Sequence, residues 1–315
     1  MTFRLAAIQA APVFLDRQAS TDKACELIAK AGEMGATVAA FGETWLPGYP
    51  RWVHAKIPYN KRRQLTARYL GAAVTIPGPE TAQLCAAARA AGSDVVIGVA
   101  ELDGTSAGTV YCTLLFISAE GEILGKHRKM KPTDGERTAW GEGDATGLRP
   151  YRRAYASISG LNCWEHNMVL PGYALMAQGT QVHIAAFPGH ETEPVAMSST
   201  RQLLLARAFA SQGAAYVVLV GGLLHPDDIA DTDLRDVIAT TQPFNGGSYI
   251  IDPMGEVIAG PAEGEEILIA DGSLDAVRTA KAMCDVAGHY SRPDLLRLVV
   301  DRTPARRLIE EDDSS

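Results

Sequence analysis

Cysteine is scarce and unpatterned in this chain of 315 residues, which has five cysteines and no C-x-x-C pair. They stand far apart, at Cys25, Cys85, Cys112, Cys163 and Cys284. An odd number at wide spacing argues against a disulfide framework and against a cysteine-based zinc site. Each cysteine is therefore either a small buried apolar side chain or a candidate nucleophile.

The chain also lacks the patterns that bind phosphates and metal ions. Gly141-Glu142-Gly143 has no third glycine of a dinucleotide loop, and no G-x-x-x-x-G-K-[ST] segment is present. The seven histidines form no H-E-x-x-H pattern and no pair spaced for one helix. We therefore expect chemistry that uses no metal and no cofactor.

Basic residues are in the minority, since 29 Lys and Arg against 37 Asp and Glu give a net charge of -8. This balance disfavours nucleic acid as a partner. No run approaches the roughly 18 apolar residues of a membrane span. Met1-Thr2-Phe3-Arg4 leads into an apolar strand-like run and not into a signal peptide. We expect a soluble cytoplasmic protein with no membrane partner.

Apolar strand-like runs alternate with helices along most of the chain. The predicted strands are 4–12, 37–41, 94–100, 181–187 and 214–220, and the predicted helices are 20–34 and 80–91, with a helical excursion over 51–69. Gly35, Gly92, Gly179 and Gly213 stand between helix and strand, where glycine closes helices. Continuous apolar strands between helices indicate sheets covered on both faces.

Two hairpin-like segments, 111–124 and 248–258, break this alternation, so the sheets should be mixed. The order of elements is similar before and after the middle of the chain, which suggests two layered sheets in an α/β fold. No low-complexity linker divides the chain. We predict one domain over residues 1–300 and a short acidic C-terminal tail over 301–315.

Three polar residues follow predicted strands, at the end of a sheet that commonly holds ligands. They are Glu43, Lys129 and Cys163. Each alone has an ordinary explanation: the glutamate as a cap, the lysine as part of a solvated basic face, and the cysteine as a core residue. Together they supply a base, a cation and a nucleophile. An addition reaction at a carbon that is multiply bonded to nitrogen or oxygen requires these three groups.

Three segments that contain these residues, 41–50, 127–133 and Cys163-Trp164-Glu165-His166, resemble the signature segments of the nitrilase superfamily. Two further segments, 136–141 and 288–294, resemble its nitrilase branch. The resemblance covers residues from about 4 to 297. One departure is Asn162, which stands where many nitrilases have a second cysteine before the nucleophile.

The resemblance implies a four-layer αββα sandwich of two mixed sheets that pairs into a homodimer or a higher homo-oligomer. It also implies that Glu43 is the general base, Lys129 a cationic stabiliser, Cys163 the nucleophile and Glu136 a supporting acid. The implied reaction converts a small-molecule nitrile to a carboxylic acid and ammonia through a thioimidate and a thioester. Hydration that stops at the amide, an amidase or carbamoylase reaction, and a catalytically silent protein stay open as alternatives.

The same chemistry suggests further site residues. A neighbouring Lys129 ammonium should favour the Cys163 thiolate, and the backbone N–H of Trp164 is a candidate oxyanion donor. Glu165 is expected to hold the turn. Candidates for the wall of the substrate pocket are Tyr49, Trp52, His54, Trp140, His166 and Phe187. His289 either steadies a charged site residue or packs at a subunit contact.

Overall fold

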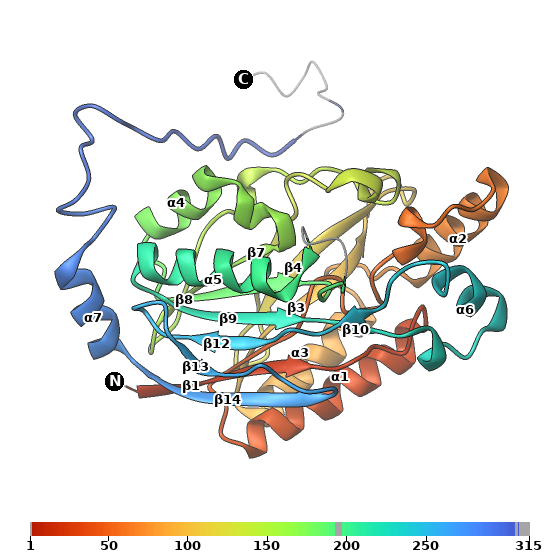
Figure 1. Cartoon of the computed structure of the whole chain (residues 1–315), viewed down its shortest axis with the longest axis horizontal. Helices are drawn as coiled ribbons and strands as arrows, with labels where there is room; N and C mark the ends of the chain where they lie inside the picture. The colour runs from red at the N-terminus through yellow and green to blue at the C-terminus, as the bar shows by residue number, and fades with distance from the viewer. Residues whose placement is uncertain (1, 193–196, 306–307, 309–315) are drawn as a thin grey trace.

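The computed structural model describes residues 2–192, 197–305 and 308, arranged as two sheets between two layers of helices (Figure 1). The helices are α1 (Arg17–Glu33), α2 (Tyr59–Ala72), α3 (Pro79–Ala91), α4 (Val169–Ala177), α5 (Ser199–Gly213), α6 (Thr232–Ile238) and α7 (Leu274–Met283). Short 3-10 helices include η1 (Arg51–His54), η2 (Asp134–Thr138), η3 (Ala145–Gly147), η4 (Cys163–Asn167) and η6 (Pro226–Asp228).

Each large sheet has six strands, of which three neighbouring strands run parallel. The first sheet has the order β14 (Glu266–Ser273), β1 (Thr2–Gln9), β2 (Val38–Ala40), β3 (Asp94–Leu102), β4 (Val110–Ile117), β5 (Ile123–Arg128). The second has the order β13 (Val257–Ala259), β12 (Tyr249–Ile251), β9 (Tyr216–Gly221), β8 (Val182–Phe187), β7 (Ser157–Asn162), β6 (Tyr151–Arg152). A separate pair joins β10 (Leu223–Leu224) to β11 (Phe244–Asn245).

The parallel strands are β1, β2 and β3 in one sheet and β7, β8 and β9 in the other. The predicted hairpins add antiparallel strands: Ile117 pairs with Ile123, and Ile251 pairs with Val257. Both sheets are therefore mixed, as predicted, and all five predicted strands are present.

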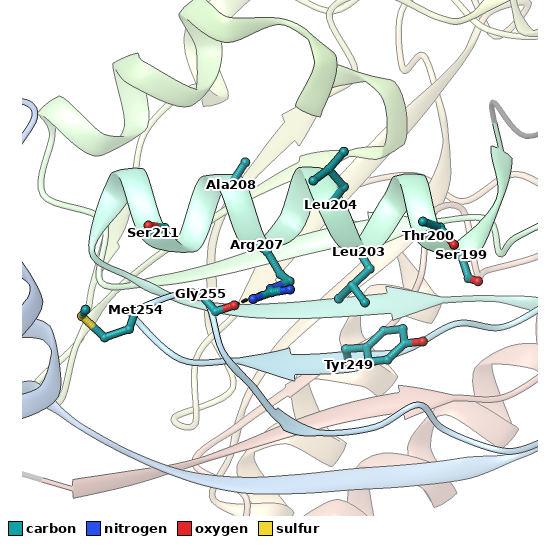
Figure 2. Close-up of a pocket in the computed structure, with 10 residues that line it drawn as sticks. All are labelled: Ser199, Thr200, Leu203, Leu204, Arg207, Ala208, Ser211, Tyr249, Met254 and Gly255. Carbon is teal, nitrogen blue, oxygen red and sulfur yellow. Dashed lines mark hydrogen bonds between the residues drawn. The ribbon is translucent and has the colours of Figure 1, made fainter.

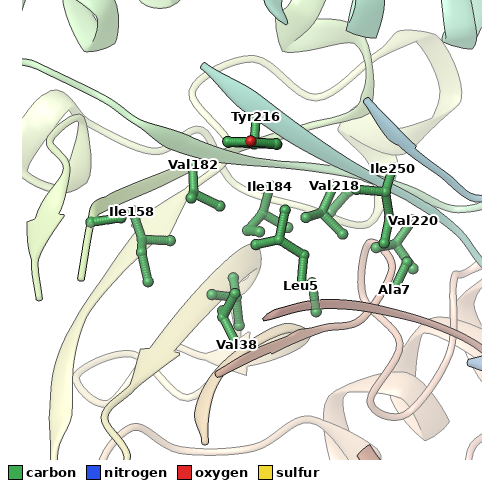
Figure 3. Packing of buried hydrophobic residues seen from close by; sticks show 14 of the residues in the cluster. Leu5, Ala7, Val38, Ile158, Val182, Ile184, Tyr216, Val218, Val220 and Ile250 are labelled. Atoms are coloured by element: carbon green, nitrogen blue, oxygen red, sulfur yellow. The ribbon is translucent and has the colours of Figure 1, made fainter. Parts of the chain in front are cut away.

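The two sheets pack face to face through aliphatic side chains. In Figure 3, Leu5 and Val38 of the first sheet meet Ile158, Ile184 and Val218 of the second, and all five are almost fully buried. Alternation along each strand sends the other set of side chains outward. α1 and α3 cover the outer face of the first sheet, and α4 and α5 cover that of the second. The predicted αββα sandwich is confirmed.

Local chemistry explains where the helices begin and end. The side chain of Asp16 accepts the Ala19 N–H at 2.9 Å, so α1 begins before the predicted residue 20. Gly92 closes α3 in the left-handed region, as predicted. At α5, however, Ala214 takes that conformation with φ +48°, and not Gly213. The predicted excursion over 51–69 is split, because Pro58 separates η1 from α2.

The described part of the predicted tail, residues 301–305 and 308, lies against the body of the protein at two places. Arg302 donates to Gln178 at 2.6 Å, and the N–H of Ala305 donates to Asp144 at 3.1 Å. The acidic residues predicted to be solvated, 310–315, lie outside the described residues. No helix within the described ranges is long and apolar enough to cross a membrane.

Candidate active site

The loop after β2 and the turns after β5 and β7 bring Glu43, Lys129 and Cys163 to one end of the sandwich. The N–H of Glu43 donates to the carbonyl oxygen of Phe187 at 3.1 Å, which ties the first sheet to the end of β8 in the second. Glu43, Lys129, Cys163 and Glu136 are each no more than 2 % exposed. Charged side chains this deeply buried need partners.

Lys129 bridges two buried carboxylates. Its Nζ donates to Glu43 Oε1 at 2.7 Å and to Glu136 Oε2 at 2.7 Å. Glu136 Oε2 also accepts the Thr133 N–H at 2.6 Å, and its Oε1 accepts the Tyr49 hydroxyl at 2.9 Å. Both oxygens of Glu136 are thus engaged, which suits a group that orients Lys129.

Glu43 is partnered on one oxygen only. Its Oε1 accepts from Lys129 and from the Cys112 thiol, whose Sγ lies 3.3 Å away. Its buried Oε2 has no hydrogen-bond partner among the residues that the structure describes. Because an unpaired buried carboxylate oxygen is costly, this atom is poised to accept a proton.

Cys163 sits in a strained turn, at the point where β7 passes into η4. Its φ is +46°, in the left-handed region that costs a residue other than glycine about 1–3 kcal/mol. Glu165 holds the turn by accepting the N–H groups of Asn162 and Met130, each at 2.9 Å, and the ring of His127 at 3.0 Å. These contacts agree with the structural role expected of Glu165.

Burial and neighbouring charges shift the pKa values of Lys129 and Glu43 in this cluster. Burial disfavours the charge on Lys129, but Glu136 and Glu43 together raise its pKa well above the usual range, so it stays an ammonium. Burial raises the pKa of Glu43 to about 7, with Lys129 opposing this shift and Glu136 adding to it.

The expectation that Lys129 favours the Cys163 thiolate agrees with the direction in which Lys129 moves the pKa of that thiol, but burial opposes this effect. Burial raises the pKa of the Cys163 thiol well above its usual range, and the nearby Glu43 charge adds to this. Lys129 and the backbone N–H of Trp164 lower that pKa, but burial outweighs them. The thiol is therefore neutral at rest and needs a base to take its proton during attack.

A cavity of about 510 Å³ opens onto Cys163. Of the predicted site residues, the ones that line it are Tyr49, His54, Glu136, Cys163 and Trp164. The remaining lining residues are Arg51, Thr133, Asp134, Glu191, Met197, Thr241, Gln242 and Phe244. Lys129 and Glu43 are buried and are not among the lining residues.

Three of the wall residues that sequence reasoning missed form one group. Arg51 pairs with the carboxylate of Glu191, and its guanidinium carbon lies 4.5 Å from the centre of the Phe244 ring. Both charged residues are buried. Arg51 and Glu191 come from distant segments of the sequence, and neither belongs to a local sequence pattern that indicates a binding or catalytic site. Arg51 in particular lies in a basic and aromatic stretch that resembles a partly exposed helix.

Four residues predicted to line the pocket do not line this cavity. Trp52 is fully buried and packs edge-on against Tyr69, with ring centres 5.3 Å apart. Phe187 contributes its carbonyl to the Glu43 loop while its side chain packs in the core under α4 and α5. Aromatic side chains at strand ends pack in the core here because each removes a large apolar area from water.

Trp140 and His166 also lie outside the cavity wall. Trp140 is buried behind Lys129, with its ring centre 5.4 Å from Nζ, and its Nε1–H donates to the Tyr69 hydroxyl at 3.2 Å. His166 turns away beneath α5 and meets His183. His289 is exposed and stands against Tyr290, so it steadies neither Glu43 nor Lys129.

A second hollow of about 470 Å³ lies between the outer side of α5 and the turn from β12 to β13 (Figure 2). Leu203, Arg207 and Tyr249 line it, and Arg207 Nε donates to the Gly255 carbonyl at 2.6 Å. It shares no lining residue with the Cys163 cavity. Within the described ranges, no group of three or more His, Cys, Asp or Glu residues could hold a metal ion.

A buried carboxyl group, an ammonium and a thiol thus lie at one end of an αββα sandwich. The sequence matches the carbon-nitrogen hydrolase family over residues 4–282. This chain therefore belongs to the carbon-nitrogen hydrolase family, and its relatives place it on the nitrilase branch.

Among those relatives is Nitrilase 2 from an unidentified prokaryote, which is 54% identical over 98% of this chain and 95% of its own length. The aliphatic nitrilase of Rhodococcus rhodochrous is 37% identical over 94% of this chain and 82% of its own. The fold is that of a carbon-nitrogen hydrolase from Helicobacter pylori G27, with a TM-score of 0.71 and 18% identity over 90% of this chain and 92% of that one.

Proposed function

We propose that this protein hydrolyses small organic nitriles to the carboxylic acid and ammonia, with Cys163 as nucleophile. The observation that carries the proposal is the buried Oε2 of Glu43, which has no hydrogen-bond partner among the described residues, in a carboxyl group whose charge acts on the Cys163 thiol. Similarity to Nitrilase 2 and to the aliphatic nitrilase of Rhodococcus rhodochrous supports a nitrile as the substrate.

The first half-reaction forms a thioimidate. Cys163 Sγ attacks the nitrile carbon while Glu43 takes the thiol proton, and that proton passes to the nitrile nitrogen. The Lys129 ammonium and the N–H of Trp164 stabilise negative charge as it develops on the substrate. Lys129 suits this role because Glu136 and Glu43 hold its charge in a buried position.

The second half-reaction uses two waters. Glu43 removes a proton from the first water, whose oxygen adds to the thioimidate carbon, and that proton passes to the nitrogen. The remaining proton of that water then also passes to the nitrogen, so the C–N bond breaks, ammonia leaves and the thioester carbonyl forms. The resulting thioester is attacked by the second water, which releases the carboxylic acid and returns the proton to Cys163. The sum is R–C≡N plus two waters giving R–COOH plus ammonia.

A panel of aliphatic, arylaceto and aromatic nitriles tests this assignment. We expect ammonia release with the carboxylic acid as the main product by chromatography. A predominantly amide product would refute the acid-forming reaction, because the tetrahedral intermediate would then expel the thiol and keep the nitrogen. Turnover of simple amides well above that of nitriles would assign the site to an amidase.

The raised pKa of Glu43 predicts the pH dependence of this reaction. Glu43 acts as a base only when ionised, and its pKa is raised to about 7. Activity should therefore be lost as pH falls through about 7, and kcat/KM should rise tenfold per pH unit well below it. The rate of Cys163 alkylation should follow the same rise. A kcat/KM that is flat from about pH 5 to pH 9 would contradict Glu43 as the base.

Replacing Tyr49 with phenylalanine is expected to lower kcat/KM about tenfold. The change removes the donor to Glu136 Oε1 at 2.9 Å, which frees Glu136 to shift toward Lys129. Steady-state kinetics on the best nitrile measure the effect. The matched control is Tyr155→Phe, which deletes a hydroxyl bonded to Asp94 at 2.6 Å outside the cavity. If the Tyr49→Phe and Tyr155→Phe variants have equal kcat/KM values, the Tyr49 hydroxyl makes no specific contribution to the reaction.

The homodimer or higher homo-oligomer that the resemblance implies stays a prediction. Large apolar side chains are exposed on α4 and α5, at Val169, Leu170 and Leu204. Such a surface on the outer helices is compatible with a second copy of the chain. Sedimentation of the purified protein would measure the oligomeric state.

A further inference from the structure

A line of hydrogen-bonded polar side chains runs from the carbonyl of Cys163 into the second sheet. His166 Nδ1 lies 2.7 Å from the carbonyl oxygen of Cys163, and His166 Nε2 lies 3.0 Å from His183 Nε2. His183 Nδ1 lies 2.9 Å from Ser159 Oγ, which is 3.1 Å from Thr180 Oγ1. Ser159, Thr180 and His183 are buried. The mechanism proposed above uses none of them.

Each contact in this line has only one direction when the rings are neutral. A carbonyl oxygen only accepts, so the His166 proton must lie on Nδ1. His166 Nε2 is then an acceptor, so His183 must carry its proton on Nε2. That leaves His183 Nδ1 to accept the Ser159 hydroxyl. The Thr180 hydroxyl has two acceptors within reach, Ser159 Oγ at 3.1 Å and the Leu175 carbonyl oxygen at 2.9 Å. One arrangement of protons therefore satisfies the line from Cys163 to Ser159.

The surroundings hold both rings in place and uncharged. The His183 ring stacks on Phe209 of α5 with centres 3.8 Å apart, and the His166 ring stacks on Phe187 at 5.3 Å. Burial lowers the pKa of His166 to about 4, with Lys129 and His127 adding to the shift and Glu165 opposing it. Burial, His166 and His127 lower the pKa of His183 well below its usual value.

We propose that His166 is a positioning residue for the nucleophile, and that His183 and Ser159 act through it. Cys163 has φ +46°, which an L-residue adopts only when the structure around it imposes that conformation. Glu165 holds the N–H groups of Asn162 and Met130 on one side of the turn. The Nδ1–H of His166 holds the Cys163 carbonyl on the other. Together they set the direction in which Sγ points.

The proposal rests on Cys163 being the nucleophile, so its test includes two readouts that need no nitrile. The first is ¹⁵N NMR of protein labelled at histidine. We expect the Nδ1–H form for His166 and the Nε2–H form for His183, near pH 7. An Nε2–H form of His166 would overturn the proposal, whether or not nitriles are hydrolysed. Absence of nitrile turnover together with the expected histidine forms would refute the proposed function alone.

The second readout is the alkylation rate of Cys163 by iodoacetamide, followed by mass spectrometry in folded variants. His166→Leu removes the donor to the Cys163 carbonyl, and alkylation and kcat should fall about 10- to 100-fold with a smaller change in KM. His166→Asn should restore most of the rate, because its amide N–H can donate to the same carbonyl. Ser159→Ala should give a smaller loss and change the His183 signals.

The matched control is Ser93→Ala, which deletes a buried hydroxyl bonded to the Ala36 carbonyl at 2.7 Å in the other half of the fold. Thermal unfolding of each variant separates loss of stability from loss of positioning. Equal alkylation rates in the His166→Leu and His166→Asn variants would overturn the proposal. So would wild-type alkylation and kcat in a folded His166→Leu protein.

Discussion

Replacing Cys163 with alanine is expected to abolish nitrile hydrolysis, with a loss of roughly 10⁴-fold or more in kcat. The reason is chemical, since no other thiol lines the cavity. Cys112, the other thiol near the cluster, is fully buried and bonded to Glu43. Ammonia release from the most reactive nitrile of the panel measures the loss.

Two matched variants make the Cys163→Ala result specific. Cys85→Ala removes a buried thiol on α3, outside the cavity, and should keep wild-type activity. Cys163→Ser keeps a hydroxyl in the same turn and should be nearly as inactive as alanine, because a hydroxyl is a far weaker nucleophile at neutral pH. Ammonia release that persists in Cys163→Ala would exclude the thioimidate route.

Replacing Lys129 with methionine is expected to lower both activity and stability. The substitution removes a fully buried ammonium that lies 2.7 Å from each of two carboxylates. Breaking a buried ion pair on one side leaves the other charge uncompensated, which costs about 3–5 kcal/mol of the free energy of unfolding. Denaturant unfolding at neutral pH measures the cost.

The pH dependence of the free energy of unfolding of the Lys129→Met variant tests whether the facing carboxyl groups cause its loss of stability. Without the cation, the raised pKa of Glu43 should rise further, so this acid binds a proton as pH falls. The stability deficit should therefore be smaller near pH 5 than near pH 8. Adding Glu136→Gln should recover part of the lost stability by removing one of the two facing acids.

Lys131→Met is the matched control, two residues along the chain. Lys131 is half exposed and pairs with the exposed Glu142, so its loss should change unfolding little. If Lys129→Met unfolds like Lys131→Met and keeps full activity, the buried cation has no part in the site. A deficit that does not depend on pH would exclude the two carboxylates as its cause.

Much of the fold could be predicted because its signals are local. Continuous apolar runs, helix-closing glycines and two hairpin segments are properties of neighbouring residues, and they yielded the strands and both mixed sheets. Where prediction failed, a nearby contact decided the outcome. Asp16 begins α1 early, Pro58 splits the 51–69 helix, and Ala214 takes the left-handed position expected of Gly213.

The candidate site also has a part that local sequence signals predict and a part that they do not. Residue type and position after a strand make Glu43, Lys129 and Cys163 candidates when the three are taken together. The cavity wall depends on distant segments that meet only in the folded chain, and Arg51 and Glu191 carry no local signal of that meeting. Aromatic type alone cannot separate Tyr49, which lines the cavity, from Trp52, which packs in the core.

The sequence by itself determined which chemical groups are available and on which strand ends they stand: a carboxyl group at Glu43, an amine at Lys129 and a thiol at Cys163. Only the tertiary structure decided their protonation. Burial is a property of the assembled fold, and it raises the pKa of Glu43 to about 7 and keeps the Cys163 thiol neutral in spite of Lys129. The folded chain also places Ser159 and His183 in a line of hydrogen bonds that ends, through His166, at the carbonyl of Cys163.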